Sequence, residues 1–194
     1  MDLLETPRER DAMSQRMFAA IELPDRITDA LADLNPRLPG LRWLPASMQH
    51  LTLVFLAAVP EEALQRLIES LDAIDMPPFA LELTDLGTFG RRRNPTVVWT
   101  GVAEPPPALY QLQRRVRDAA LAAGLEMDDK PFRPHVTLAR CKGLSKQDLR
   151  PLIEAHRESA FGAFEVTGFA LFASELHPDG ARHERVFRRD FEPA

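Results

Sequence analysis

The alternation of apolar and polar positions predicts a chain that mixes β-strands with amphipathic helices. Period-two alternation is typical of half-buried strands, whereas apolar residues spaced three and four apart indicate a helix with one buried face. The apolar run at 53–56 is too hydrophobic to lie on a surface, so we expect it inside a buried strand. The strands predicted in this way cover residues 16–22, 40–43, 51–58, 79–86, 96–102, 134–141, 161–172 and 185–191, and the helices begin near residues 24, 60, 105 and 146.

The order of these elements suggests an internal duplication. A strand, a helix, a histidine-bearing strand, a second helix and further strands are followed by helix, histidine-bearing strand, helix and strands. The two histidines, His50 and His135, lie 85 residues apart, close to half the length of the structured chain. We therefore predict an α+β fold of two pseudo-symmetric lobes, each a mainly antiparallel sheet with helices on its outer face, around a central cleft.

Two short segments carry the candidate chemistry: His50-Leu51-Thr52-Leu53 and His135-Val136-Thr137-Leu138. Successive side chains of a strand point to opposite faces, so each histidine shares a face with the threonine two positions later. One such segment is ordinary, but two copies in a chain with only five histidines indicate a site. One imidazole can accept a proton while the other donates one, and hydroxyls can hold phosphate oxygens. A cyclic phosphodiester between the two segments suits this arrangement.

Composition narrows the function classes further. The 194 residues are 45% hydrophobic, enough for a sizeable core, and the net charge of −5 argues against a broad nucleic-acid-binding surface. No apolar run approaches the ~20 residues needed to span a bilayer, so we expect no membrane association. The only cysteine, Cys141, allows no intrachain disulfide and no cysteine cluster for zinc, which favours a reducing cytoplasm.

The first residues differ in character from the rest. Residues 1–15 are rich in charge and lack the apolar segment of a secretory signal. We therefore expect a flexible N-terminal extension over 1–15, followed by a single bilobal domain over 16–194. Because no strong apolar stripe is left over for a surface, we expect a monomer.

Several segments together resemble the 2H phosphoesterase superfamily, and within it the bacterial RNA 2′,3′-cyclic phosphodiesterases, also called 2′-5′ RNA ligases. The most specific segment is Pro131-Phe132-Arg133-Pro134-His135-Val136-Thr137-Leu138-Ala139-Arg140. The resemblance runs from about residue 16 to 191 and is carried by the segments 16–21, 43–45, 50–56, 93–99, 131–140 and 171–176. It implies a two-lobed fold, no metal and no cofactor.

The resemblance also implies an activity and roles for individual residues. The activity is hydrolysis of a 2′,3′-cyclic phosphate on an RNA end or nucleotide to a 2′-phosphate, with reversible 2′-5′ RNA ligation as a possible second reaction. His50 would protonate the departing 3′ oxygen, His135 would activate water, and Thr52 and Thr137 would hold phosphate oxygens.

Arg140 matches a family arginine near the phosphate. Strict alternation from His135 sends residue 140 to the opposite face, so this role requires a strand end or bulge near Ala139. A salt bridge at the rim of the cleft is the alternative reading of Arg140. In addition, His183 stands where the family often has an aromatic residue, which affects how a nucleoside is held.

Two other functions remain as alternatives. A metallohydrolase could use His50 and His135 with Asp128 or Asp129, although no HExxH or HxH spacing supports it. A non-catalytic protein of the same fold could bind RNA ends or nucleotides without turnover. The intact pair of motifs favours the enzyme.

Overall fold

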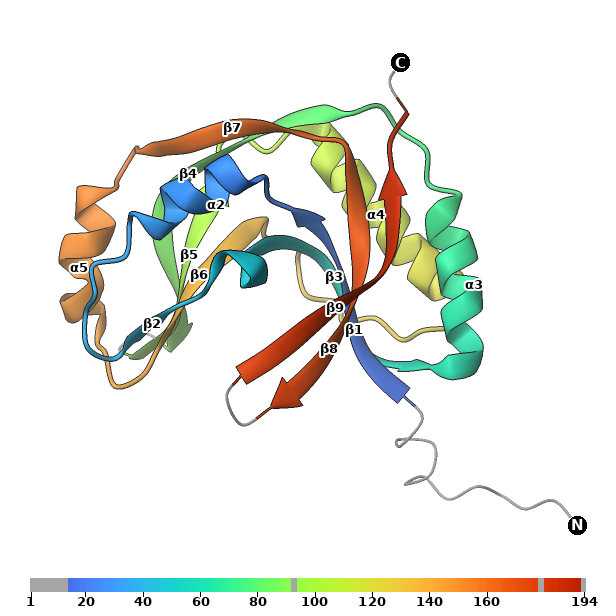
Figure 1. Cartoon of the computed structure of the whole chain (residues 1–194), viewed down its shortest axis with the longest axis horizontal. Helices are drawn as coiled ribbons and strands as arrows, with labels where there is room; N and C mark the ends of the chain where they lie inside the picture. The colour runs from blue at the N-terminus through green and yellow to red at the C-terminus, as the bar shows by residue number, and fades with distance from the viewer. Residues whose placement is uncertain (1–13, 92–93, 178–179, 193–194) are drawn as a thin grey trace, which may run out of the picture.

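The computed structural model of the protein describes residues 14–91, 94–177 and 180–192. It is an α+β structure in which strands dominate, as Figure 1 shows. The helices are α2 (Asp25–Ala32), α3 (Glu61–Asp72), α4 (Pro107–Ala122) and α5 (Lys146–Ala155), with a short 3₁₀ turn, η1 (Ala46–Met48). The strands are β1 (Ser14–Glu22), β2 (Leu41–Trp43), β3 (His50–Pro60), β4 (Phe79–Arg91), β5 (Asn94–Val102), β6 (His135–Cys141), β7 (Ala160–Val166), β8 (Gly168–His177) and β9 (Gly180–Asp190).

The nine strands form one continuous, strongly curled sheet. Its order is β7-β4-β5-β6-β3-β1-β8-β9, and β2 pairs separately with β6. The two halves meet where β3 lies beside β6, through the single antiparallel pair of Leu51 and Val136. The predicted α+β class is confirmed, and the two predicted sheets prove to be joined edge to edge.

The two lobes are not successive halves of the chain. We call β9-β8-β1-β3 the His50 lobe and β6-β5-β4-β7, with β2, the His135 lobe. The first lobe therefore combines the first and last strands of the sequence, while β2 and the strands from β4 to β7 build the second. Helices α3 and α4 pack on each other and on β3, whereas α2 contacts β7 and α5 contacts β4 (Figure 1).

The structure differs from the sequence prediction in several element boundaries and in the burial of one residue. The predicted strand over 161–172 is two strands, β7 and β8, which separate at Thr167 and lie at opposite ends of the sheet order. β1 begins at Ser14, two residues inside the predicted extension, and residues 1–13 lie outside the described part. Phe55, expected to be buried, is 68% exposed.

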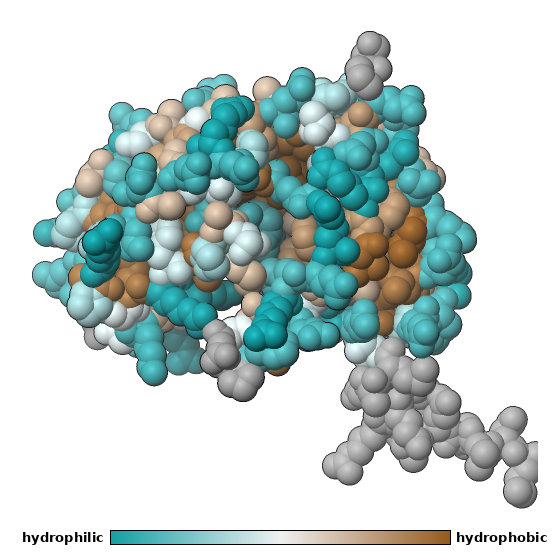
Figure 2. Space-filling model, in the orientation of Figure 1, coloured by the Kyte–Doolittle hydropathy of each residue, from teal (hydrophilic) through white to brown (hydrophobic). Residues whose placement is uncertain are grey.

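One hydrophobic core extends through both lobes. It includes Leu51 at the junction, Leu67 of α3 and Leu109 of α4, together with Leu83 and Phe164 of the His135 lobe. Most of the face seen in Figure 2 is hydrophilic, and an apolar area lies at the right, near α3 and α4. Within the described ranges, no helix has the length and apolar character needed to cross a membrane.

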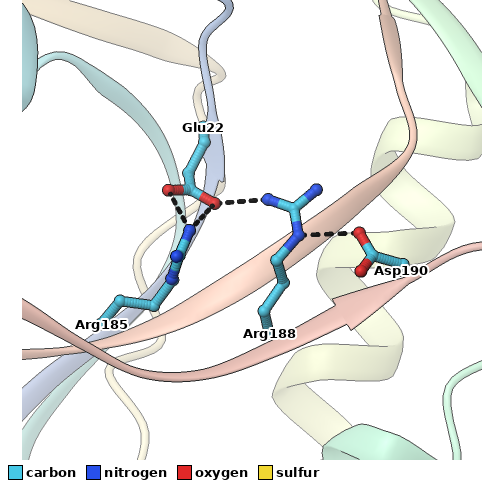
Figure 3. A network of polar contacts seen from close by, with 4 residues as sticks. All are labelled: Glu22, Arg185, Arg188 and Asp190. Carbon is cyan, nitrogen blue, oxygen red and sulfur yellow. Dashed lines mark hydrogen bonds and ion pairs between the residues drawn. The ribbon is translucent and has the colours of Figure 1, made fainter.

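An ion-pair network ties the end of β1 to β9 across the intervening strand (Figure 3). Glu22 accepts from Arg185 Nη1 at 3.1 Å and from Arg188 Nη1 at 2.5 Å. Arg188 Nε in turn donates to Asp190 Oδ1 at 2.7 Å. Because Glu22 lies opposite His50 in the β1–β3 ladder, this network stands close to the candidate site.

Candidate active site

The two histidine motifs meet at the centre of the sheet. β3 and β6 are antiparallel neighbours, and the paired residues Leu51 and Val136 are both fully buried. Side chains on either side of such a pair point to the opposite face. The flanking histidines and threonines of both strands therefore share the concave face, and the two motifs are related by a local twofold axis through the Leu51–Val136 pair.

A β-bulge lies at the last residue of each four-residue motif. In β3 the ladder to β1 skips Leu53, because Thr52 pairs with Ala20 and Val54 with Ala19. In β6 the ladder to β5 skips Leu138 in the same way, because Thr137 pairs with Trp99 and Ala139 with Val98. An extra residue reverses the alternation of all side chains that follow it.

The bulges decide which side chains reach the site. Each one turns the residue five positions after the histidine onto the face of that histidine. In β3 this residue is Phe55, and in β6 it is Arg140. Arg140 thus has the bulge that its placement near a phosphate requires, immediately before Ala139.

The five predicted site residues line one cleft of about 480 Å³. The structure brings together His50, Thr52, His135, Thr137 and Arg140. Arg16 and Arg42 also line the cleft, and neither is among the site residues predicted from the sequence. A signal for Arg16 exists in its period-two spacing from Phe18 on the strand that pairs with the His50 strand. The guanidinium groups give the cleft a local positive charge in an otherwise acidic protein.

Both histidines are oriented by the backbone two residues before them. His135 Nδ1 lies 2.7 Å from the carbonyl oxygen of Arg133. A carbonyl only accepts, so Nδ1 carries the hydrogen and the neutral ring has its lone pair on Nε2. His50 makes the corresponding backbone hydrogen bond at Met48. Each ring is thereby held in one orientation for proton transfer.

Aromatic side chains of β1, β4 and β5 pack against the two imidazoles. Phe18 of β1 is 3% exposed, as expected for a core residue, and its ring stacks on His50 with centroids 4.6 Å apart. On the other side, Phe89 stands edge-on to His135 at 4.8 Å and Trp99 lies 6.3 Å from it. This packing restricts both rings, which favours a fixed distance between the two proton-transfer groups.

Burial lowers the pKa of both imidazoles. The pKa of His50 falls from 6.5 to about 4, chiefly because burial disfavours the charged ring, and the nearby charges of His183 and His135 act in the same direction. Burial also lowers the pKa of His135, against the opposing effect of its hydrogen bond to Arg133. In the free protein both rings are therefore neutral at pH 7.

His183 is a third histidine at the cleft. Its ring lies edge-on to Phe18 at 4.7 Å and to His50 at 5.6 Å. Its Nδ1 is buried and has no hydrogen-bond partner among the described residues. In the sequence His183 stands out only as a departure from the family pattern, because it lies far from His50 along the chain and their contact is not apparent.

The ligand set of the alternative metallohydrolase is not assembled. Asp128 pairs with Lys130, and Asp129 accepts from Arg117 Nη2 at 2.9 Å. In the part of the chain that the structure describes, no three side chains of His, Cys, Asp or Glu converge on one point. The two aspartates instead neutralise neighbouring cations.

Comparison with known proteins gives the same family by sequence and by structure. A family model described as the 2′-5′ RNA ligase superfamily matches residues 23–178. A protein named RNA 2′,3′-cyclic phosphodiesterase from Escherichia coli K12 is 35% identical over 178 residues, covering 90% of this chain and 95% of that protein. The crystal structure of E. coli LigT in apo form matches with a TM-score of 0.76 and 31% identity, covering 92% of this chain and 98% of that one.

A Geobacillus stearothermophilus protein with the same name as the E. coli relative is 33% identical over 165 residues. The match covers 82% of this chain but only 52% of that protein, so the chain spans about half the length of this relative.

Proposed function

Because the chain belongs to the 2′-5′ RNA ligase superfamily, we propose that it hydrolyses 2′,3′-cyclic phosphates on RNA ends or nucleotides to 2′-phosphates. The observation that carries the proposal is the convergence of both His-x-Thr motifs and Arg140 on one cleft. A cyclic phosphate there lies between two imidazoles, with hydroxyl and guanidinium donors for its non-bridging oxygens. This is the arrangement that in-line displacement at phosphorus requires.

The proposed mechanism assigns one proton transfer to each histidine. His135 takes a proton from water through Nε2, the oxygen attacks phosphorus, and the P–O3′ bond breaks. His50 gives a proton to the departing O3′, which leaves a 2′-phosphate and a free 3′-hydroxyl. Thr52, Thr137 and Arg140 stabilise the negative charge that develops on the non-bridging oxygens.

The low pKa of His50 bears on this assignment. In the free protein His50 is the weaker base, and it loses its proton more readily than an ordinary histidine. A bound phosphodiester anion between the rings favours the protonated form of each, since an opposite charge raises an imidazole pKa. Substrate binding therefore favours protonation of the histidine that acts as the acid. In the reverse reaction the two histidines exchange roles.

The test is hydrolysis of 2′,3′-cyclic nucleotides and short cyclic-ended RNAs, with identification of the phosphate position in the product. We expect His50→Ala and His135→Ala each to lower kcat by about 10²- to 10⁴-fold. His156→Ala is the matched control, because His156 ends α5 and lies outside the cleft. EDTA leaves the wild-type rate unchanged.

Full activity in either cleft variant would reject the mechanism. Tight binding of cyclic-ended RNA without turnover by the wild-type protein would instead identify a non-catalytic RNA-end binder. We further propose that the protein is a monomer, because the sequence leaves no strong apolar stripe for an interface, and that it acts in the cytoplasm, because Cys141 is its single cysteine. Size-exclusion chromatography with light scattering tests the first of these points.

A further inference from the structure

Two smaller cavities flank the central cleft, and each borders only one of the two histidines. The His50-side cavity, of about 290 Å³, is lined by His50 but not by His135. The His135-side cavity, of about 400 Å³, is lined by His135 but not by His50. The latter shares Thr52, Phe55 and His135 with the central cleft, so the two cavities adjoin at these residues.

The chemistry of in-line displacement gives these cavities different uses. The entering oxygen and the departing oxygen lie on opposite sides of phosphorus. In the function proposed above, on which this inference rests, O3′ departs toward His50 and the nucleophile enters beside His135. A nucleophile larger than water must therefore place the rest of its structure on the His135 side, where the His135-side cavity opens.

The lining of the His135-side cavity suits a nucleotide. Phe55 is 68% exposed at its border, and Phe132 also lines it, which offers aromatic faces for a base. Arg117, Lys130 and Arg133 contribute three cations, against the single carboxylate of Asp128.

The cations differ in their availability. Arg117 and Lys130 are paired with Asp129 and Asp128, whereas the exposed Arg133 side chain makes no ion pair with any described residue. The His50-side cavity differs, because none of its described lining residues is a lysine or arginine and two carboxylates line it, Asp25 and the ion-paired Glu22. Of the two flanking cavities, the His135-side cavity is therefore the more favourable for a strand with phosphates.

We propose that the His135-side cavity is the acceptor subsite for the 5′-terminal nucleoside of a second RNA strand. The 5′-hydroxyl takes the place of water: His135 accepts its proton, the 5′ oxygen forms a bond to phosphorus, and the P–O3′ bond breaks as His50 protonates O3′. The product is a 2′-5′ phosphodiester with a free 3′-hydroxyl. In the reverse direction, O3′ attacks the same phosphorus and the 5′ oxygen leaves with a proton from His135.

The experiment measures how often the cyclic phosphate reacts with water and how often it reacts with the 5′-hydroxyl of a second RNA. A short RNA that ends in a 2′,3′-cyclic phosphate is incubated with a second RNA that has a 5′-hydroxyl, and joined and hydrolysed products are quantified together. Two variants alter the cavity by different means. Arg133→Glu reverses the charge of the unpaired cation, and Gln113→Trp fills the cavity from α4.

We expect both variants to lower the ratio of joining to hydrolysis by about tenfold or more, since water needs none of the cavity. Arg157→Glu is the control, because it reverses a charge that lines none of the three cavities. Cleavage of a 2′-5′-linked RNA gives a second readout, and it should fall in parallel with joining.

Three outcomes would overturn the inference while leaving the hydrolase intact. The first is an unchanged ratio in both variants. The second is a raised KM for hydrolysis of the cyclic-ended RNA without a change of ratio, which would place that strand itself in the cavity. The third is a wild-type protein that hydrolyses cyclic phosphates but neither joins nor cleaves 2′-5′ linkages. A wild-type protein without hydrolysis rejects the proposed function as well.

Discussion

At the scale of single residues, the two histidines have equivalent supports but different electrostatic surroundings. Both bond to backbone two positions earlier, and both pack against aromatic rings. His50, however, is the more enclosed ring, and His183 stands 5.6 Å from it. Near-identical local sequences thus give two imidazoles with different proton affinities, which is the property an acid–base pair requires.

The first prediction concerns the pH dependence of kcat/KM, which reports the free enzyme. In the proposed mechanism one histidine is protonated and the other is neutral, so turnover needs one proton on the pair of histidines. This proton is lost as pH rises toward 6.5, because burial lowers the pKa of both rings below that value. A second proton binds only near the His50 pKa of about 4. We expect the maximum of kcat/KM to lie between about 4 and 6.5.

The measurement is initial rates with a 2′,3′-cyclic nucleotide from pH 4 to 9, with circular dichroism as the control that the protein stays folded. At pH values well above the maximum, loss of one proton should lower kcat/KM by about tenfold per pH unit. The maximum of kcat should lie at higher pH, because the bound anion raises both pKa values. A kcat/KM maximum above pH 7 would contradict the prediction.

At the scale of elements, the packing of β4 on β5 determines the wall behind His135. Gly87 of β4 lies opposite Trp99 of β5, and a Cβ added at Gly87 would come within 2.2 Å of Trp99 Cζ2. The indole is itself 5.1 Å from Phe89 and 6.3 Å from His135. Glycine is therefore needed here for space, since it lets the indole lie flat across the strand.

The second prediction is that Gly87→Ala destabilises the fold by about 1–3 kcal/mol and lowers kcat, because the displaced indole moves toward His135. Gly101→Ala is the control in the adjacent strand, where a Cβ meets its nearest neighbours only at 3.4 Å. Urea unfolding and steady-state rates measure the two effects. Equal stability of the two variants would show that Trp99 can move freely.

The sequence pattern predicted the helices and strands well, but it did not predict the local irregularities inside the strands. The His-x-Thr faces followed directly from period two, but the bulges at Leu53 and Leu138 consist of ordinary leucines and leave no mark in the pattern. The exposure of Phe55 was therefore missed. Arg140 was singled out only through the family resemblance, together with the condition that a bulge should precede it.

At the scale of the whole molecule, one residue pair joins the sheets of the two lobes edge to edge. Leu51 and Val136 are the only β3–β6 pair, and both are fully buried. The sequence order of elements could not show this arrangement, because the C-terminal strands return to the N-terminal one. A repeat of element types predicts similar lobes, but not which strands each lobe contains.

The third prediction concerns this junction. Leu51→Ala should destabilise the protein by about 2–5 kcal/mol, as expected for an emptied core site. It should also lower kcat of the folded fraction, since the twofold relation of the two histidines depends on this pair. Leu67→Ala in α3 is the matched control, because Leu67 is equally buried but lies away from the junction.

Thermal unfolding and rates at a temperature where both variants are fully folded would separate the two effects. Similar stability losses with a lower kcat only in Leu51→Ala support the role of the junction. An equal kcat in both variants would show that the cleft geometry does not depend on this contact.

The interleaving of the lobes also imposes an order on biosynthesis. Translation delivers β1 first, yet Phe18 pairs with Phe172 of β8, and His183 of β9 completes the surroundings of His50. While residues 168–190 are still inside the ribosomal tunnel, β1 has an open edge and His50 lacks part of its enclosure. A nascent chain therefore completes the surroundings of His50 only after the β8–β9 hairpin has left the tunnel.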